Sequence, residues 1–122
     1  MQVGLSEDGT DGYVASLIPY RNNQKCVTQV QTKCRRVQFR FSMMNIEQTS
    51  PVDCVHDRVF VQSPGEFDSG PLCGYDTGSI AGSVQQRNYS VWNEVLGGTF
   101  LVAFETDRQL VFNGFSLIFK VV

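Results

Sequence analysis

Three acidic residues stand where apolar, strand-like segments begin or end. Glu47 follows an apolar segment that ends at Ile46, and Asp57 directly precedes Arg58–Val61. Asp107 comes soon after another apolar run, so the pattern of an apolar strand ending in a carboxylate occurs again far along the chain. Carboxylates supply the hard oxygen atoms that cations bind. Their chemistry therefore depends on which strands bring them together.

The single histidine, His56, lies beside Asp57. A catalytic role for it needs a nucleophile or a second base placed by a motif. The sequence contains neither a Gly-x-Ser-x-Gly motif nor the His-Glu-x-x-His pattern of a metalloprotease helix. We therefore expect a protein that is not an enzyme, with His56 in a packing or hydrogen-bonding role.

One strand is predicted just before the first acid, Glu47. Val37, Phe39 and Phe41 alternate with polar residues, which is the period of a strand with one wet face. The parity of the apolar positions changes at Met43–Met44. We predict a β-bulge there, with both methionines filling the core.

The remaining segments also read as short strands between turn residues, and none shows helical periodicity over three turns. Residues 1–12 are rich in Gly, Asp, Glu and Ser, so we predict a mobile lead-in followed by a single domain over residues 13–122. Strands at this spacing favour a sandwich or a barrel, with Trp92 in the core. The predicted strands are Tyr13–Ile18, Cys26–Gln31, Val37–Met43, Arg58–Val61, Tyr89–Val95, Thr99–Phe104 and Gly114–Val122.

Composition excludes two classes of partner. The 122 residues carry a net charge of -2, which leaves no large basic field for nucleic acid. No apolar run approaches the roughly 18 residues that a membrane-spanning helix needs. No signal peptide is visible at the N-terminus, and we interpret the chain as an excised or mature segment.

The four cysteines, Cys26, Cys34, Cys54 and Cys73, favour disulfides, because no Cys-x-x-Cys pair is present. Four cysteines allow three pairings. Asn88 begins an Asn-Tyr-Ser sequence that can accept a glycan. Both features are typical of a secreted, extracellular protein.

Several motifs, in order, resemble the CUB domain family. They are Tyr20–Cys26, the run Val37-x-Phe39-x-Phe41 with Ile46-Glu47, Cys54-x-x-Asp57, Leu72-Cys73-Gly74, and Phe104-x-x-Asp107 with Gly114-Phe115. The resemblance implies an all-β, jelly-roll-like β-sandwich of two antiparallel sheets. It also implies an extracellular protein-interaction module that belongs to a larger protein.

The sequence departs from the family pattern at several positions. The usual first cysteine is missing and Cys34 is additional, so the resemblance implies the pairs Cys26–Cys34 and Cys54–Cys73. His56 replaces the usual tyrosine before the second acid, and Thr28 replaces an aromatic residue. Gln109 stands where calcium-binding members often have serine.

By resemblance, Glu47, Asp57 and Asp107 bind calcium, which prefers six to eight hard oxygen ligands. Glu47, Asp107 and His56 would then receive a lysine or arginine side chain of a partner.

Two alternatives remain open. In one, the domain is a carbohydrate or glycosaminoglycan-binding module of the spermadhesin type, with a basic strip that includes Arg36 and Arg40 and lies near Lys33 and Arg35. In the other, it is a structural spacer in a larger extracellular chain.

Overall fold

The fold is all-β. The computed structural model describes residues 1–7, 10–16, 22–31, 36–46, 54, 57–74, 89–96, 99–107 and 114–122. No helix among these residues is long and apolar enough to cross a membrane. The strands of these residues are β1 (Gln2–Leu5), β2 (Asp11–Ala15), β3 (Lys25–Gln31), β4 (Val37–Asn45), β5 (Arg58–Ser63), β6 (Phe67–Asp68), β7 (Asn93–Val95), β8 (Thr99–Glu105) and β9 (Gly114–Val121).

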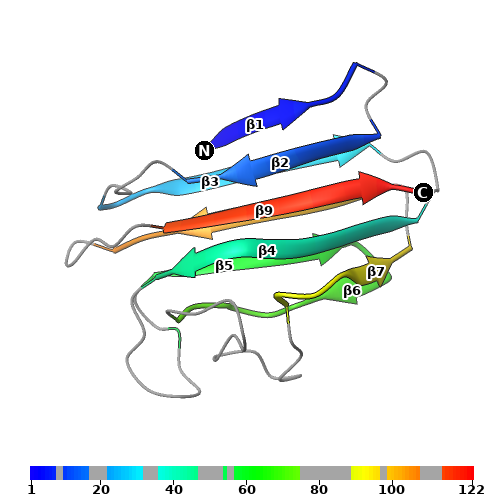
Figure 1. The fold of residues 1–122 in the computed structure, drawn as a ribbon. Helices are drawn as coiled ribbons and strands as arrows, with labels where there is room; N and C mark the ends of the chain where they lie inside the picture. Colours follow the sequence, from blue (N-terminus) through cyan, green and yellow to red (C-terminus); the bar gives the residue numbers. More distant parts are fainter. Residues whose placement is uncertain are drawn as a thin grey trace.

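The strands form two antiparallel sheets that pack as two layers (Figure 1). The first sheet has five strands in the order β1-β2-β9-β4-β7, and the second has four in the order β3-β8-β5-β6. Neighbours in each sheet are mostly distant in sequence. This arrangement confirms the predicted β-sandwich of two antiparallel sheets.

Strand β4 is the longest strand of the described residues, and its burial follows the predicted alternation. Val37, Phe39 and Phe41 are buried. Between Phe41 and Met43 the pairing with β9 shifts by one residue, which confirms the bulge and places it at Ser42, just before Met43–Met44. Met44 then points into the core, whereas Met43 is only half-buried.

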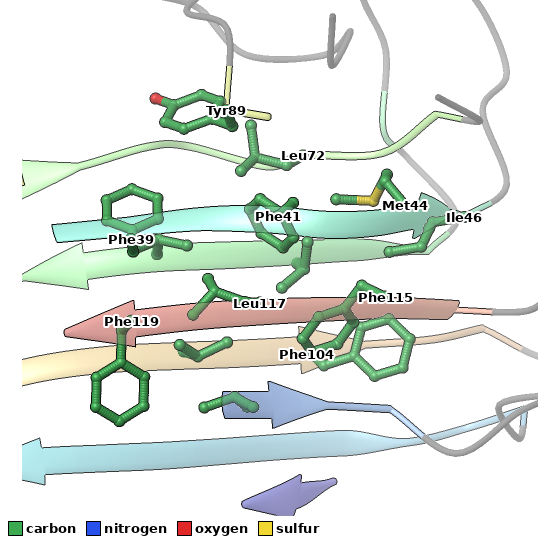
Figure 2. Close-up of a cluster of buried hydrophobic side chains, with 14 of the residues drawn as sticks. Phe39, Phe41, Met44, Ile46, Leu72, Tyr89, Phe104, Phe115, Leu117 and Phe119 are labelled. Atoms are coloured by element: carbon green, nitrogen blue, oxygen red, sulfur yellow. The ribbon is translucent and has the colours of Figure 1, made fainter. Parts of the chain in front are cut away.

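Aromatic rings join the two layers in the core (Figure 2). The Phe39 ring on β4 lies 5.6 Å from the Phe100 ring on β8. Near the opposite end of β8, the rings of Phe104 and Phe115 are 5.1 Å apart in an edge-to-face arrangement. Burying such large rings provides most of the driving force for packing one sheet on the other.

The predicted lead-in is wrong, because Gln2–Leu5 form β1 and pair with β2. Ser6 N–H donates to Asp11 O at 2.9 Å, and Ser6 Oγ accepts the Asp11 N–H at 3.1 Å. Ser6 and Asp11 are therefore joined at the end of the β1–β2 ladder, and residues 2–5 are not a free tail. Strand β2, predicted from Tyr13, begins at Asp11 and lies between β1 and β9.

Two predictions for the second half of the chain need correction. The predicted strands did not include Phe67–Asp68, but these residues pair with β5 as strand β6. Trp92 was expected in the core, but it is 43% exposed. The reason is parity: Val95 on β7 points inward, so Trp92, three residues earlier, faces the outer side.

Candidate metal-binding end of the sandwich

Two of the three predicted acids, Asp57 and Asp107, lie at one end of the sandwich. We call it the acid-bearing end; β5 begins there and β8 ends there (Figure 1). Arg58 pairs with Glu105 across these two strands, so Asp57 and Asp107 lie just beyond the same end of the ladder. The end of β4 reaches this region through the segment 72–74, because Leu72 pairs with Val59 and Gly74 pairs with Ile46.

Asp57 is fully buried, at 0% exposure. It is the one charged side chain with that burial among the residues that the structure describes. A carboxylate taken out of water is costly unless hydrogen bonds or a cation compensate its charge. The position of Asp57 therefore has to be explained by what surrounds it.

Asp107 provides one such compensation. Its backbone N–H donates to Asp57 Oδ1 at 2.9 Å. Its carbonyl oxygen accepts the Asn23 N–H at 2.7 Å. The backbone of Asp107 is thus fixed from two sides, whereas its side chain is only half-buried.

The segment before β3 holds the end of β8 in place. Gln24 N–H donates to Thr106 Oγ1 at 2.7 Å, and Thr106 N–H donates to Gln24 O at 2.9 Å. Asn23 adopts a left-handed backbone with φ of 56°, a conformation that asparagine tolerates better than most residues. These contacts determine where the Asp107 carboxylate lies.

The remaining predicted members of this site, Glu47 and His56, lie outside the described residues. Glu47 directly follows Ile46, which is held by two backbone hydrogen bonds to Gly74 of 2.8 and 3.1 Å. Within the described part of the chain, no three His, Cys, Asp or Glu side chains form a complete metal-binding group. The structure therefore brings together Asp57 and Asp107 of the predicted three acids.

The donors of this end fit a hard cation. Two carboxylates come from separate chain segments, and one of them is fully buried. Calcium accepts carboxylate and backbone carbonyl oxygens in flexible geometry, so loop segments suit it better than they suit magnesium. The chemistry of these residues is thus consistent with calcium.

A disulfide fastens the same end. Cys54 and Cys73 are bonded, with Cα atoms 5.7 Å apart, and both are buried. This confirms the second predicted pair. The bond links the chain just before Asp57 to the segment that pairs with β4 and β5.

Cys26 departs from the prediction. It has a free thiol and is half-buried. Its strand, β3, lies at the edge of the second sheet, and its one neighbour among the described strands is β8. Cys34 and the potential glycosylation site Asn88 both lie outside the described residues, and the predicted Cys26–Cys34 bond has no support in the structure.

The predicted basic strip is divided in the structure. Arg36 forms an ion pair with Glu94 at 3.8 Å. Arg40 instead lies over the Trp92 ring, 5.5 Å from its centroid. Lys33 and Arg35 lie outside the described residues. Arg36 is therefore engaged by an acid, whereas Arg40 lies against an exposed tryptophan that was predicted to lie in the core.

Comparison with known proteins identifies the family. A family model for the CUB domain matches residues 13–119. This chain belongs to the CUB domain family. CUB domains are protein-interaction modules that occur in larger extracellular proteins. No relative was found among curated protein sequences.

Solved CUB structures share the fold. The calcium-bound CUB2 domain of MASP-1 is 17% identical with a TM-score of 0.70, and the match covers 91% of this chain and 92% of that one. The CUB1-EGF-CUB2 fragment of rat MASP-1 is 22% identical with a TM-score of 0.70, and the match covers 93% and 40%. The extracellular region of zebrafish Gpr126/Adgrg6 is 22% identical with a TM-score of 0.69, and the match covers 93% and 14%.

These identities are low, so the likeness shows the fold alone. The placement of Asp57 and Asp107 on separate segments at one end of the sandwich comes from the strand pairing and hydrogen bonds of this chain itself.

Proposed function

We propose that this CUB domain is an extracellular protein-interaction module that binds Ca²⁺ through Glu47, Asp57 and Asp107. The observation that carries the proposal is the buried Asp57 carboxylate, with the Asp107 backbone hydrogen-bonded to it at 2.9 Å. The MASP-1 CUB2 domain, similar in fold, was crystallised with Ca²⁺, which supports the same ion here.

The ion would neutralise carboxylates that otherwise repel one another, and so would order the loops at this end. Asp107 is half-buried, which leaves its side chain accessible from outside. We propose that Asp107, together with Glu47 and His56, receives a lysine or arginine side chain of a partner protein. A compact ammonium group can approach carboxylates that already share a cation.

Thermal unfolding with calcium or with a chelator tests the ion. Calcium at 100 times its dissociation constant should stabilise the domain by about 2.7 kcal/mol, which corresponds to a rise of several degrees in Tm. Glu47→Ala, Asp57→Asn and Asp107→Ala should each abolish that rise. Glu66→Gln is the matched control, since Glu66 is an exposed acid at the other end of β5, and it should keep the rise.

The partner contact needs its own probe. We expect Nα-acetyl-lysine amide to shift the amide NMR signals of the residues around Asp107 only when calcium is present. The corresponding norleucine amide has the same carbon chain without the ammonium group and should cause no shift. A calcium-independent response, or equal responses to both compounds, contradicts the proposed contact. No rise in Tm at millimolar calcium contradicts the ion itself.

A further inference from the structure

The outer face of the five-stranded sheet carries a second candidate site, which is built from aromatic and basic residues and not from acids. We call it the Trp92 platform. Its members all point away from the core, by the alternation of the strands that carry them. They are Tyr13 on β2, Arg40 on β4, Trp92 just before β7, and Ile118 and Lys120 on β9.

The pairing of the strands makes these residues neighbours. Arg40 pairs with Ile118, and Ile118 pairs in turn with Tyr13. Lys120 lies two residues beyond Ile118 on β9, so it is a diagonal neighbour of Arg40 at roughly 7–8 Å between Cα atoms. The platform thus has an aromatic residue near each side and two cations between them.

Both cations converge on Trp92. The Lys120 ammonium lies 4.4 Å from the centre of the Trp92 ring and the Arg40 guanidinium 5.5 Å from it. Their charged groups are therefore no more than about 10 Å apart, a separation similar to the Debye length of about 8 Å at physiological salt. An indole ring attracts cations but leaves their positive charge in place.

Neither cation has an acidic partner among the described residues. Lys120 lies directly opposite Asp11 in the β2–β9 pairing, yet no ion pair forms between them. The nearby acid Glu94 is occupied, because it pairs with Arg36 and accepts a hydrogen bond from Gln38. The platform is therefore a local positive site on an acidic protein, with Trp92 43% and Tyr13 42% exposed.

From these observations we propose that the Trp92 platform binds a sulfated glycan chain. Sulfate groups complement Arg40 and Lys120, while the apolar faces of sugar rings suit contact with Trp92 and Tyr13. A protein partner usually relies on aromatic or arginine anchors that fill pockets. The two described pockets, around Gln62–Asp68 and Val95–Leu96, include no platform residue, so the platform favours a chain that needs no pocket.

The site does not depend on the calcium proposal, because none of its residues belongs to the acid-bearing end. It can be tested in the presence of a chelator, so that failure of one proposal leaves the other standing. The chain also provides its own reporter, since Trp92 is its only tryptophan. A ligand that reaches the platform should change the intrinsic fluorescence of the protein.

The experiment titrates the domain with a heparin octasaccharide at low salt, in chelator, and follows tryptophan fluorescence together with calorimetric binding. We expect binding that weakens as salt rises and that a desulfated, N-acetylated octasaccharide does not reproduce. The double variant Arg40→Ala/Lys120→Ala should weaken binding by about tenfold or more. Trp92→Ala should also weaken binding, as measured by calorimetry.

The matched control removes two positive charges from the other outer face. Lys25 and Arg58 both pair with Glu105, at 3.9 and 3.0 Å, and the double variant Lys25→Ala/Arg58→Ala has the same net charge as the platform variant. It should retain near wild-type affinity. Unchanged circular dichroism of each variant shows that folding is intact.

Equal losses in the two double variants overturn the proposal, because they indicate a general charge effect. Binding without a fluorescence change places the glycan elsewhere and overturns it too. Tighter binding of an acidic peptide, such as hexaglutamate, than of the octasaccharide contradicts the choice of glycan. Absence of binding at low salt rejects the site.

Discussion

The acid-bearing end and the Trp92 platform differ in the sign of their charges and in how deeply those charges are buried. At the end, Asp57 is fully buried and its carboxylate is hydrogen-bonded by the backbone of Asp107. On the platform, Arg40 and Lys120 are half-buried and lie over an exposed ring. The Asp57 charge lies in the interior of the folded protein, whereas the Arg40 and Lys120 charges lie on the outer face of the sheet. The free energy of unfolding should therefore depend on the acid-bearing end and hardly at all on the Trp92 platform.

The two regions also differ in what positions their side chains. Arg40 and Lys120 stand within β4 and β9, whose long ladder fixes their spacing. Asp57 and Asp107 stand just beyond strand ends, so hydrogen bonds and the Cys54–Cys73 disulfide must fix them. A site on strands is built when the sheet forms. A site on loops needs additional constraints, and those constraints can be removed one at a time.

The largest expected effect comes from removing the disulfide at the acid-bearing end. Cys54→Ala/Cys73→Ala should lower the free energy of unfolding by about 3 kcal/mol, because the bond closes a chain separation of 19 residues. Urea denaturation measures this loss. Cys26→Ala is the control, since its thiol is free, and it should cost clearly less. Equal losses for the two variants would show that the bond does not stabilise this end.

A smaller effect is expected at Asp57. Without calcium, Asp57→Ala leaves the Asp107 N–H without its acceptor and should lower the free energy of unfolding by about 1–3 kcal/mol. Asp57→Asn keeps an oxygen at the same place and removes the buried charge, so it should cost less than alanine. Urea denaturation in the presence of a chelator measures the free energy of unfolding of the alanine and asparagine variants. If asparagine costs as much as alanine, the charge itself, and not the hydrogen bond, stabilises the apo protein.

Sequence pattern was sufficient for the strands of the core. The alternation of Phe39 and Phe41 on β4, and of Phe115 and Leu117 on β9, reflects which side of a strand is buried. That property is local, because side chains alternate with a period of two whatever the strand pairs with. The change of parity near Met43–Met44 predicted a bulge for the same reason, and the pairing with β9 shows it.

Pairing between distant segments was harder to predict. The strand β1 was taken for part of a mobile lead-in because residues 1–12 are rich in Gly, Asp, Glu and Ser, whereas its place in the sheet comes from the pairing with β2. Cys26 illustrates the same limit, because its sheet partner is β8 and not a neighbouring hairpin strand. For the candidate site, the sequence supplied Asp57 and Asp107, but not the hydrogen bond between them.

Trp92 and Lys120 were missed for a different reason. Tryptophan is usually buried, and a single lysine in the last strand carries no motif. The available signal was parity, since Lys120 alternates with buried Leu117 and Phe119 on β9, and Arg40 alternates with Phe39 and Phe41 on β4. Aligning the outward residues of neighbouring strands needs the strand order, which only the structure provides.

The smallest expected effect on stability belongs to the platform. Arg40→Ala/Lys120→Ala removes two cation–π contacts at an exposed ring, each worth about 0.5–1 kcal/mol, but it also removes repulsion between two cations without acidic partners among the described residues. These terms oppose each other, so the free energy of unfolding should change by less than about 1 kcal/mol. Urea denaturation at low and high salt separates the terms, because salt screens the repulsion between exposed charges and leaves the contact with the ring less affected. The double variant should therefore compare less favourably with the wild type at high salt than at low salt. A loss of unfolding free energy as large as that of Asp57→Ala would mean that Arg40 and Lys120 stabilise the fold. It would argue against a ligand-binding role for these two cations.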